Sequence, residues 1–353
     1  MSKYIKLFET TSEYEEYING GDVILPNVSL CEDERRVHYN PWAPHDYSQD
    51  YFTMVVTTGG DVTWTGITPT GSSSNALSYS TDNGTTWSTA SSNITLSVNE
   101  SDKILWKGTT TPRSGKGIGK FSGTSTVKYS IEGNVMSLLF GDNFKGQTSL
   151  EGKTDALYYL FYDNKNITSA ENLSLPATTL ANHCYHSMFS GCTSLTTAPV
   201  LPATTLTESC YHSMFSGCTS LTTAPVLPAT TLANYCYIGM FQGCTSLTTA
   251  PVLPATTLAN YCYQYMFQGC TSLTTAPVLP ATTLTESCYE RMFWGCTSLN
   301  SIKCLATNIS ASDCTYYWVK DVAASGTFTK ASSISSWTTG IDGIPSGWTV
   351  VDA

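Results

Sequence analysis

The fold of this chain is decided by the stretch CYHSMFSGCTSLTTAPVLPATTL, residues 184–206, which returns every 26 residues. Its paired cysteines recur at 184/192, 210/218, 236/244, 262/270 and 288/296. A unit this short cannot bury its apolar side chains alone, whereas stacked neighbours share a continuous core. The sequence therefore predicts a stack of repeats, with atypical end units at residues 157–176 and from Cys314 onward.

Five positions are identical in all five units and are predicted to form the core. In the first unit they are Cys184, Tyr185, Met188, Phe189 and Cys192. Their spacing of three and four residues predicts one face of a short helix, which ends at the glycine before the second cysteine.

The rest of each unit is predicted to be a short strand and a return loop. Leu180, Leu195, Val200 and Leu201 are expected to face inward, while Pro199 keeps the strand short because proline cannot donate to a ladder. Strands about 4.8 Å apart opposite helices about 8–10 Å apart predict a curved solenoid. Equivalent cysteines on such helices would lie too far apart for a disulfide, so they are expected to be reduced core residues.

Other positions change from unit to unit and are expected to form a solvent-facing stripe across the stack, which we call the variable stripe. It comprises His186, His212, Ile238, Gln242, Tyr265, Gln268, Arg291 and Trp294. Exposed aromatic side chains often anchor interfaces, so this stripe is the candidate partner-binding surface. The alternative is neutral variation on a surface without a partner.

The strand position is almost constant, so its threonines are expected to form a ladder. They are Thr197, Thr223, Thr249 and Thr275. Threonine favours strands and forms hydrogen bonds across a ladder, which gives the array a structural explanation. A regular hydroxyl array that binds an ordered ligand, such as a glycan or ice, is the alternative.

The segment from Phe189 to Leu195, followed by Leu201-Pro202, resembles the BspA-type (Treponema-type) leucine-rich repeat, which reads Phe-x-x-Cys-x-x-Leu and then Ile/Leu-Pro. The tail at residues 326–350 is similar to the ending of many such proteins from gut Bacteroidota and their phages. The resemblance covers about residues 130–353. Members of this family are surface adhesion and interaction proteins, so the resemblance implies binding rather than catalysis.

Residues 1–45 are too few for a comfortable core and are expected to dock onto a partner or onto a copy of the same chain. They resemble N-terminal segments of structural proteins from phages of gut Bacteroidales, including crAss-like phages. That resemblance implies docking onto virion proteins.

Residues 46–140 alternate short β-rich runs with turn signals, which predicts an immunoglobulin-like β-sandwich. Asp82-Asn83-Gly84 predicts a tight hairpin turn within it. Trp64, Trp87 and Trp106 are expected either in its core or, alternatively, as a platform for sugars.

Charge and composition exclude several functions. At net −10 and pI near 4.9 the chain is too acidic for nonspecific binding to nucleic acid, and it has no apolar run long enough to span a bilayer. Its start lacks the apolar run of a signal peptide. His183 and His186 flank Cys184 but are absent from later units, which argues against zinc. The glycine-rich residues 115–120 fail the phosphate-loop spacing and are expected to form a flexible loop.

Together these observations predict a multi-domain chain of α/β and all-β parts: an N-terminal anchor (1–45), a β-sandwich (46–140), a leucine-rich-repeat solenoid (141–303) and a small β C-terminal cap (304–353). We expect no catalytic residues, metal or cofactor. The expected function is binding to a host-surface glycan or protein from a phage virion, as a head or tail fibre, with homotrimer formation as one option. A purely structural virion decoration protein and a bacterial cell-surface adhesin are the alternatives.

Overall fold

In a computed structural model the chain divides into two compact units, Met1–Asp46 and Tyr47–Ala353. The structure describes residues 45–67, 77–90, 93–335 and 337–353. The predicted anchor therefore lies outside the described residues, apart from its last residue. All that follows concerns the second unit.

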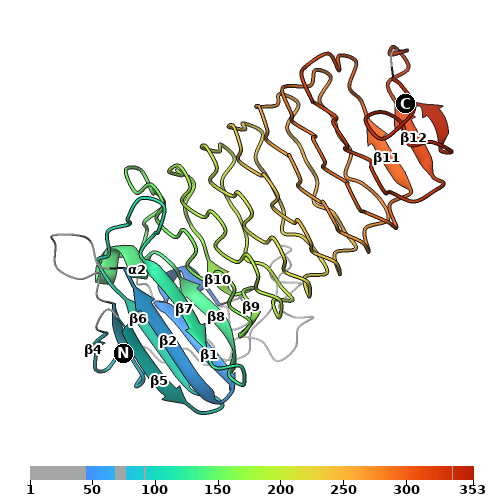
Figure 1. Ribbon diagram of the computed structural model, residues 1–353. Helices are drawn as coiled ribbons and strands as arrows, with labels where there is room; N and C mark the ends of the chain where they lie inside the picture. The colour runs from blue at the N-terminus through green and yellow to red at the C-terminus, as the bar shows by residue number, and fades with distance from the viewer. Residues whose placement is uncertain (1–44, 68–76, 91–92, 336) are drawn as a thin grey trace, which may run out of the picture. The chain divides into compact units, whose positions relative to one another are not determined.

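The second unit begins with two antiparallel sheets whose inner faces meet (Figure 1). The smaller sheet has the order β5-β2-β7, with β2 at Gly60–Gly66, β5 at Asn93–Val98 and β7 at Gly119–Gly123. The larger sheet has the order β8-β1-β6-β3-β4. Its strands are β1 (Phe52–Thr58), β3 (Ser78–Ser80), β4 (Ser88–Thr89), β6 (Lys103–Lys107) and β8 (Lys128–Asn134).

Aromatic side chains fill the space between the two sheets. Phe121 of β7 lies 4.6 Å from Trp64, 5.0 Å from Trp106 and 5.6 Å from Phe52 between ring centroids. All four side chains are fully buried. Trp64 and Trp106 are thus core residues and not a sugar platform, whereas Trp87 is only half-buried.

Two local predictions for this region have opposite outcomes. The predicted turn is confirmed, because Asn83 and Gly84 take φ of 55° and 84° between the paired strands β3 and β4. The loop predicted at 115–120 is wrong at its end, since β7 begins at Gly119 and pairs with β2. Gly119 begins this strand because the Thr65 carbonyl and the Trp64 ring leave no room there for a Cβ atom.

Helical structure is sparse. The described residues contain two short 3-10 helices, η1 (Tyr47–Gln49) and η2 (Gly141–Asn143), and one α-helix, α2 (Ser137–Phe140). At four residues, α2 is far too short to cross a membrane, and no other described helix is longer. The α/β part of the predicted fold class is therefore wrong: the described chain is mostly strands and turns.

The larger sheet passes directly into the repeats. Strand β8 pairs in parallel with β9 (Ile167–Ser169) and β10 (Leu173–Ser174), which belong to the first coil of the stack. Backbone groups at that edge of the sheet are thus paired with the coil instead of being open to other chains. From there the coils follow side by side toward the C-terminus (Figure 1).

The first half of each coil is a ribbon of consecutive tight turns, at residues 181–192 in the first full unit, which we call the turn ribbon. Alternate amides donate in different directions. The amides of Tyr185 and Ser187 donate to the carbonyl oxygens of Cys210 and His212 in the next coil. The amide of His186, which lies between them, donates three residues back within its own coil. The predicted helix is wrong, because an α-helix would direct every one of these amides four residues back.

A left-handed residue recurs every four positions along the turn ribbon. In the first full unit His183, Ser187 and Gly191 have φ of 56°, 51° and 78°, and the equivalent residues of the other units have positive φ as well. Each such residue ends one turn and lets the next begin. A period of four keeps the same residues on one face as a helix does over two turns, so the expected inward face is nevertheless the buried one.

Each core position forms a column along the stack. The tyrosine rings of the Tyr185 column lie 5.6 to 6.1 Å apart, and the phenylalanine rings of the Phe189 column 5.5 to 5.9 Å apart, almost parallel within each column. The thiol of Cys218 donates to the carbonyl of Phe189 in the preceding coil, and its equivalents do the same. The twelve described cysteines are free and buried, although not because helices hold them apart.

The second half of each coil, which we call the return segment, is paired only at single residues. Isolated parallel bridges join Thr223 to Thr249 and Thr205 to Thr231, in keeping with the very short strand that Pro199 predicts. Leu195 and Leu201 face the core, but Val200 is exposed, so its predicted inward orientation is wrong. Because both halves of a coil are hydrogen-bonded to the next, the expected cause of curvature, wide helix spacing, does not apply.

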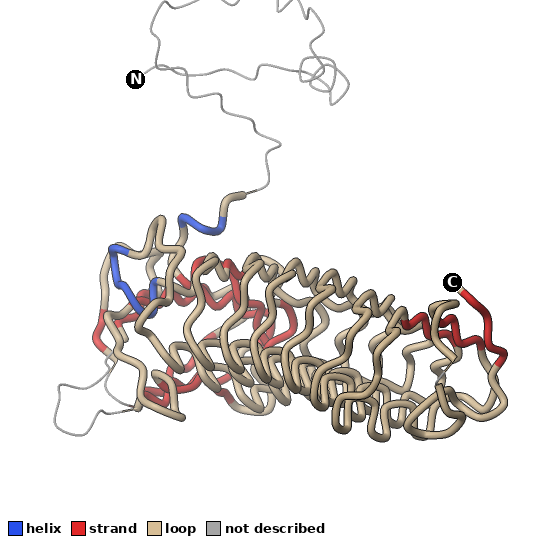
Figure 2. Tube along the Cα trace, turned by 90° about the horizontal axis from the view of Figure 1, so that it is seen from above, coloured by secondary structure: helices blue, strands red, loops and turns tan. Residues whose placement is uncertain are grey.

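Three parallel strands close the C-terminal end: β11 (Ser301–Cys304), β12 (Thr327–Lys330) and β13 (Thr349–Asp352). Figure 2 shows strands gathered at the two ends of this unit, with turns and loops between them. Trp318 takes the place of the repeated methionine and is fully buried, 6.3 Å from the Tyr289 ring. The described chain is thus an all-β repeat protein.

Candidate functional site

The turn ribbon decides which side chains reach the surface. Because the pattern repeats every four residues, positions 184, 185, 188 and 189 are buried, while 186 and 190 lie between them and are only half-buried. Hydrogen bonds from coil to coil place the same position of each unit directly beside its neighbours. The variable stripe is therefore a set of columns whose members touch, rather than isolated solvent-facing residues.

At the N-terminal end of the variable stripe the column is made of imidazole rings. His186 stacks on Tyr158 at 4.6 Å and lies 4.3 Å from the His212 ring. Burial, with neighbouring histidines, lowers the pKa of His186 to about 3 and that of His212 to about 4. Both rings are therefore neutral at pH 7, which makes this end of the stripe uncharged.

The positions of the histidines bear on whether this end of the stripe could bind a metal ion. His183 lies 6.0 Å from His186 between ring centroids, and its nearest carboxylate partner is Asp155 at 3.7 Å. Within the described residues no group of three or more His, Cys, Asp or Glu side chains is placed to hold a metal ion.

In the middle of the stripe, amide side chains pair between coils. Gln242 donates to the Gln268 carbonyl oxygen at 2.5 Å, and Gln264 donates to the Glu290 carboxylate at 2.6 Å. Ile238, one coil before Gln264, is half-buried. Residues that differ between units are thus complementary to their neighbours in adjacent coils.

At the C-terminal end lies a group of rings and cations that we call the aromatic–cation cluster: Tyr265, Arg291, Trp294, Tyr317 and Lys320. The Arg291 guanidinium donates to the Tyr265 hydroxyl at 2.7 Å and lies 5.3 Å from the Trp294 ring and 6.0 Å from the Tyr317 ring. The Lys320 ammonium lies 4.9 Å from Trp294 and 5.1 Å from Tyr317. Cations at such distances are attracted to the ring faces.

Two carboxylates border the aromatic–cation cluster without neutralising all of it. Asp321 accepts a hydrogen bond from the Trp294 indole at 3.1 Å, and Glu290 lies 3.8 Å from the Arg291 Nε. Arg291 Nε is buried without a hydrogen-bond partner in the described part of the chain. No acceptor among the described residues is bonded to the Lys320 ammonium either. The Lys320 ammonium is thus left as an unpaired donor beside aromatic surface.

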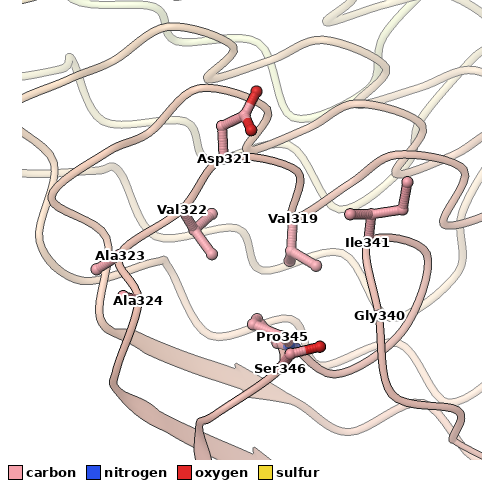
Figure 3. Close-up of a pocket in the computed structure, with 9 residues that line it drawn as sticks. All are labelled: Val319, Asp321, Val322, Ala323, Ala324, Gly340, Ile341, Pro345 and Ser346. Atoms are coloured by element: carbon pink, nitrogen blue, oxygen red, sulfur yellow. The ribbon is translucent and has the colours of Figure 1, made fainter.

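A small pocket of about 170 Å³ lies next to the cluster, beneath the loop that carries Lys320. Figure 3 shows the side chains of Val319, Val322 and Pro345 facing its centre, whereas the Asp321 carboxylate points away from it. The full lining is Val319, Asp321, Val322, Ala323, Ala324, Gly340, Ile341, Pro345 and Ser346. It is smaller than the roughly 300–1,000 Å³ of sites that enclose a small molecule, so the cluster is a surface site.

The structure brings seven of the eight predicted stripe residues together in three groups and leaves the half-buried Ile238 outside them. His186 pairs with His212, Gln242 pairs with Gln268, and Tyr265, Arg291 and Trp294 form most of the aromatic–cation cluster. Tyr158, Tyr317 and Lys320 were missed. Counting 26 residues on from Arg291 and Trp294 reaches Tyr317 and Lys320, so the period carried the signal although the last unit is degenerate.

The family described as BspA type Leucine rich repeat region (6 copies) matches residues 154–264 and 226–332, together just over half of the chain. No curated protein and no solved structure matches. The matched repeats contain the turn ribbons and the columns described above, which confirms the resemblance seen in the sequence. This is a non-enzymatic repeat family of the binding and adhesion type. The chain belongs to the BspA-type leucine-rich repeat family.

Proposed function

We propose that the chain is a host-surface-binding protein of a phage virion and that it contacts its partner through the variable stripe, chiefly at the aromatic–cation cluster. The ligand is a glycan or protein of the host surface. The observation that carries the proposal is the gathering of Tyr265, Trp294 and Tyr317 around two cations, Arg291 and Lys320, at one end of an otherwise sparsely charged stack. Aromatic rings and arginine are the side chains that most often dominate binding energy.

The arrangement of the other parts follows from this proposal. Residues 1–45 attach the chain to virion structural proteins, and the immunoglobulin-like sandwich is the spacer between them and the solenoid in the sequence. The chain is assembled into the particle in the host cytoplasm and is released with it. Display on a bacterial cell surface is the alternative location. We propose no nucleic-acid partner and no membrane insertion.

A purely structural decoration protein is the second candidate function. It is favoured by the pairing of stripe residues with one another, as in Gln242–Gln268 and Gln264–Glu290, since side chains satisfied within the stack need no external ligand. This reading accounts for the middle of the stripe. It gives no reason for the unpaired Lys320 ammonium of the aromatic–cation cluster.

The test is attachment of particles, or of the purified chain, to host cells. Tyr265→Ala with Trp294→Ala removes two rings of the cluster and is expected to abolish attachment without preventing particle assembly. Thr245→Ala with Thr271→Ala changes exposed side chains of neighbouring coils and is the matched control, which should attach normally. Undiminished attachment of the ring variant would eliminate the cluster as the binding site and favour the decoration protein.

Attachment to the virion has a separate test. Deletion of residues 1–45 should leave the chain folded but absent from assembled particles. Its continued presence in purified particles would contradict the proposed anchor.

A further inference from the structure

The return segments carry a continuous apolar column on their outer side. Val200, Val226, Val252 and Val278 are 70%, 73%, 76% and 50% exposed, and they are the four most exposed large apolar side chains in the described part of the chain. Equivalent positions lie in adjacent hydrogen-bonded coils, so the four valines follow one another in a line. An apolar surface of this regularity is typical of an interface.

The surface around this column is free of charge over four coils. Residues 193–206, 219–232, 245–258 and 271–284 contain only Thr, Ser, Leu, Ala, Pro and Val. We call the outer side of these segments the return face. In a chain of net charge −10, an uncharged face is where a second acidic copy can approach without local repulsion.

Opposite charges stand at the two ends of the column. Counted from the bridge between Ser169 and Thr197, Glu171 and the residue after it occupy the places of Pro199 and Val200. At the other end is Lys303, an exposed residue between two buried residues of β11. It occupies the position that Val278 has in the preceding coil. Neither the Glu171 carboxylate nor the Lys303 ammonium has a hydrogen bond or ion pair among the described residues.

We propose that the return face docks against the return face of a second copy of this chain, with the two coil stacks antiparallel. A two-fold axis midway between Val226 and Val252 places each of these valines opposite the other in the second copy. The same axis sets Lys303 of the second copy opposite the residue that follows Glu171, so the Glu171 carboxylate lies next to that ammonium, and this contact occurs twice. One symmetry operation thus pairs both the valines and the charges.

The available area is adequate for such a pair. Six coils about 4.8 Å apart extend about 24 Å, and the nine residues from Thr197 to Thr205, the bridged positions of a return segment, span at most about 30 Å. The return face therefore offers on the order of 700 Å² per copy, close to the roughly 800 Å² per partner of a standard interface. The proposal is independent of the host-binding function, because the return face and the variable stripe are formed by different halves of each coil.

The first measurement is the mass of the full chain by sedimentation equilibrium over a range of concentrations. We expect association from one chain of 38.2 kDa to a pair of about twice that mass. A chain that stays monomeric up to about 100 μM, weaker than the micromolar range of specific complexes, overturns the proposal. A three-chain mass overturns it equally, because three copies cannot share one two-fold interface.

The second measurement tests the charge pairing by exchange. Glu171→Lys and Lys303→Glu should each weaken association at least about tenfold, because each places like charges in contact twice. The double variant Glu171→Lys with Lys303→Glu restores opposite charges and should recover wild-type association. Glu100→Lys and Lys116→Glu, at exposed sites in the sandwich, are the matched controls and should have no effect. Failure of the double variant to recover association overturns the antiparallel arrangement.

The third measurement tests the apolar column. Val226→Lys with Val252→Lys should abolish pairing, since four ammonium groups would meet at the centre of the interface. Gln242→Lys with Gln268→Lys introduces the same charges in adjacent coils of the turn ribbon and should leave pairing intact. The two valines are exposed and the two glutamines are half-buried, and circular dichroism establishes that each variant is folded. Pairing that survives the valine substitutions excludes the return face as the interface.

Discussion

The turn ribbon and the return segment belong to the same 26-residue unit, yet they hold neighbouring coils together in different ways. In the turn ribbon every second amide donates to the next coil, whereas the return segment has only isolated bridges. The ribbon also carries the stacked aromatic columns, which the return segment lacks. The ribbon is therefore expected to contribute most of the stability, and the return segment mainly closes each coil.

The two halves also differ in how they vary. The return segment is nearly identical from unit to unit, while the outer positions of the turn ribbon change. The densely hydrogen-bonded backbone of the ribbon holds its fold independently of the outer side chains. Variation is thus found on the half whose backbone is best supported.

The largest expected difference between the halves is in the core of the turn ribbon. Phe241→Ala removes a fully buried ring from the middle of its column and should lower the free energy of unfolding by about 3–5 kcal/mol. Val252→Ala in the return segment of the same unit should cost less than about 0.5 kcal/mol, because its side chain is exposed. Urea unfolding of both variants measures the difference. Equal losses would contradict the assignment of stability to the ribbon.

A smaller effect is expected from the left-handed residues of the ribbon. Gly217 has φ of 71°, so Gly217→Ala should cost about 1–2 kcal/mol through backbone strain. No clash contributes, since the nearest atoms to an added Cβ lie 3.6 Å away. Ser213→Gly, at φ of 52°, is the opposite change and should be neutral or stabilising. A destabilising Ser213→Gly together with a neutral Gly217→Ala would show that the ribbon conformation is wrong.

The paired histidines should make stability depend on pH. Their folded pKa values lie below the usual 6.5, mainly through burial, at about 3 for His186 and about 4 for His212. As pH falls below 6.5, the unfolded state binds protons that the folded state does not, so stability is lost down to about pH 4 for His212 and about pH 3 for His186. His186→Gln with His212→Gln should remove a loss on the order of 1 kcal/mol at pH 5, after allowance for partial solvent exposure.

The control for the histidine variant is the same comparison at pH 8, where both rings are neutral in either state. The stability difference between wild type and variant should be constant above pH 7 and should shift in favour of the variant below it. Parallel pH profiles for the two proteins would mean that these rings do not titrate differently on unfolding.

The smallest effect is expected from pairs within the variable stripe. Gln242→Ala deletes a half-buried hydrogen bond to Gln268 and should lower the free energy of unfolding by about 0.5–1.5 kcal/mol. Thr256→Ala, exposed on the return face of the next return segment, should change it by no more than about 0.5 kcal/mol. If Thr256→Ala proves the more damaging, the return segments contribute more to cohesion than their sparse bridges indicate.

The sequence predicted the repeat, its period and the buried columns, because these depend only on which positions stay apolar. It did not predict the turn ribbon. Over the nine residues from Cys184 to Cys192, a period of four differs from the period of 3.6 by less than one residue, so both place the same side chains inward. The residues that mark the difference, His183 and Ser187, are left-handed without being glycine.

The candidate site was predicted in part. Tyr265, Arg291 and Trp294 were identified because they stand where other units have smaller or uncharged side chains, and because aromatic residues and arginine favour binding. The burial of the histidines and the pairing of glutamines could not be predicted, because they depend on coils being one hydrogen bond apart instead of one helix diameter apart. Val200 was wrongly predicted to face inward. Its apolar side chain favours burial, and the sequence does not show that Leu195 and Leu201 already fill the core at this point.

The alternating amides of the turn ribbon make every internal coil interchangeable with the next. Through its turn-ribbon amides, a coil accepts hydrogen bonds from the coil before it and donates to the coil after it, in the same register each time. One unit can therefore be inserted or lost without changing what either end requires. Each insertion lengthens the stack by about 4.8 Å. The length of the stack is thus set by the number of units, and duplication of the gene segment that encodes one unit is enough to change it.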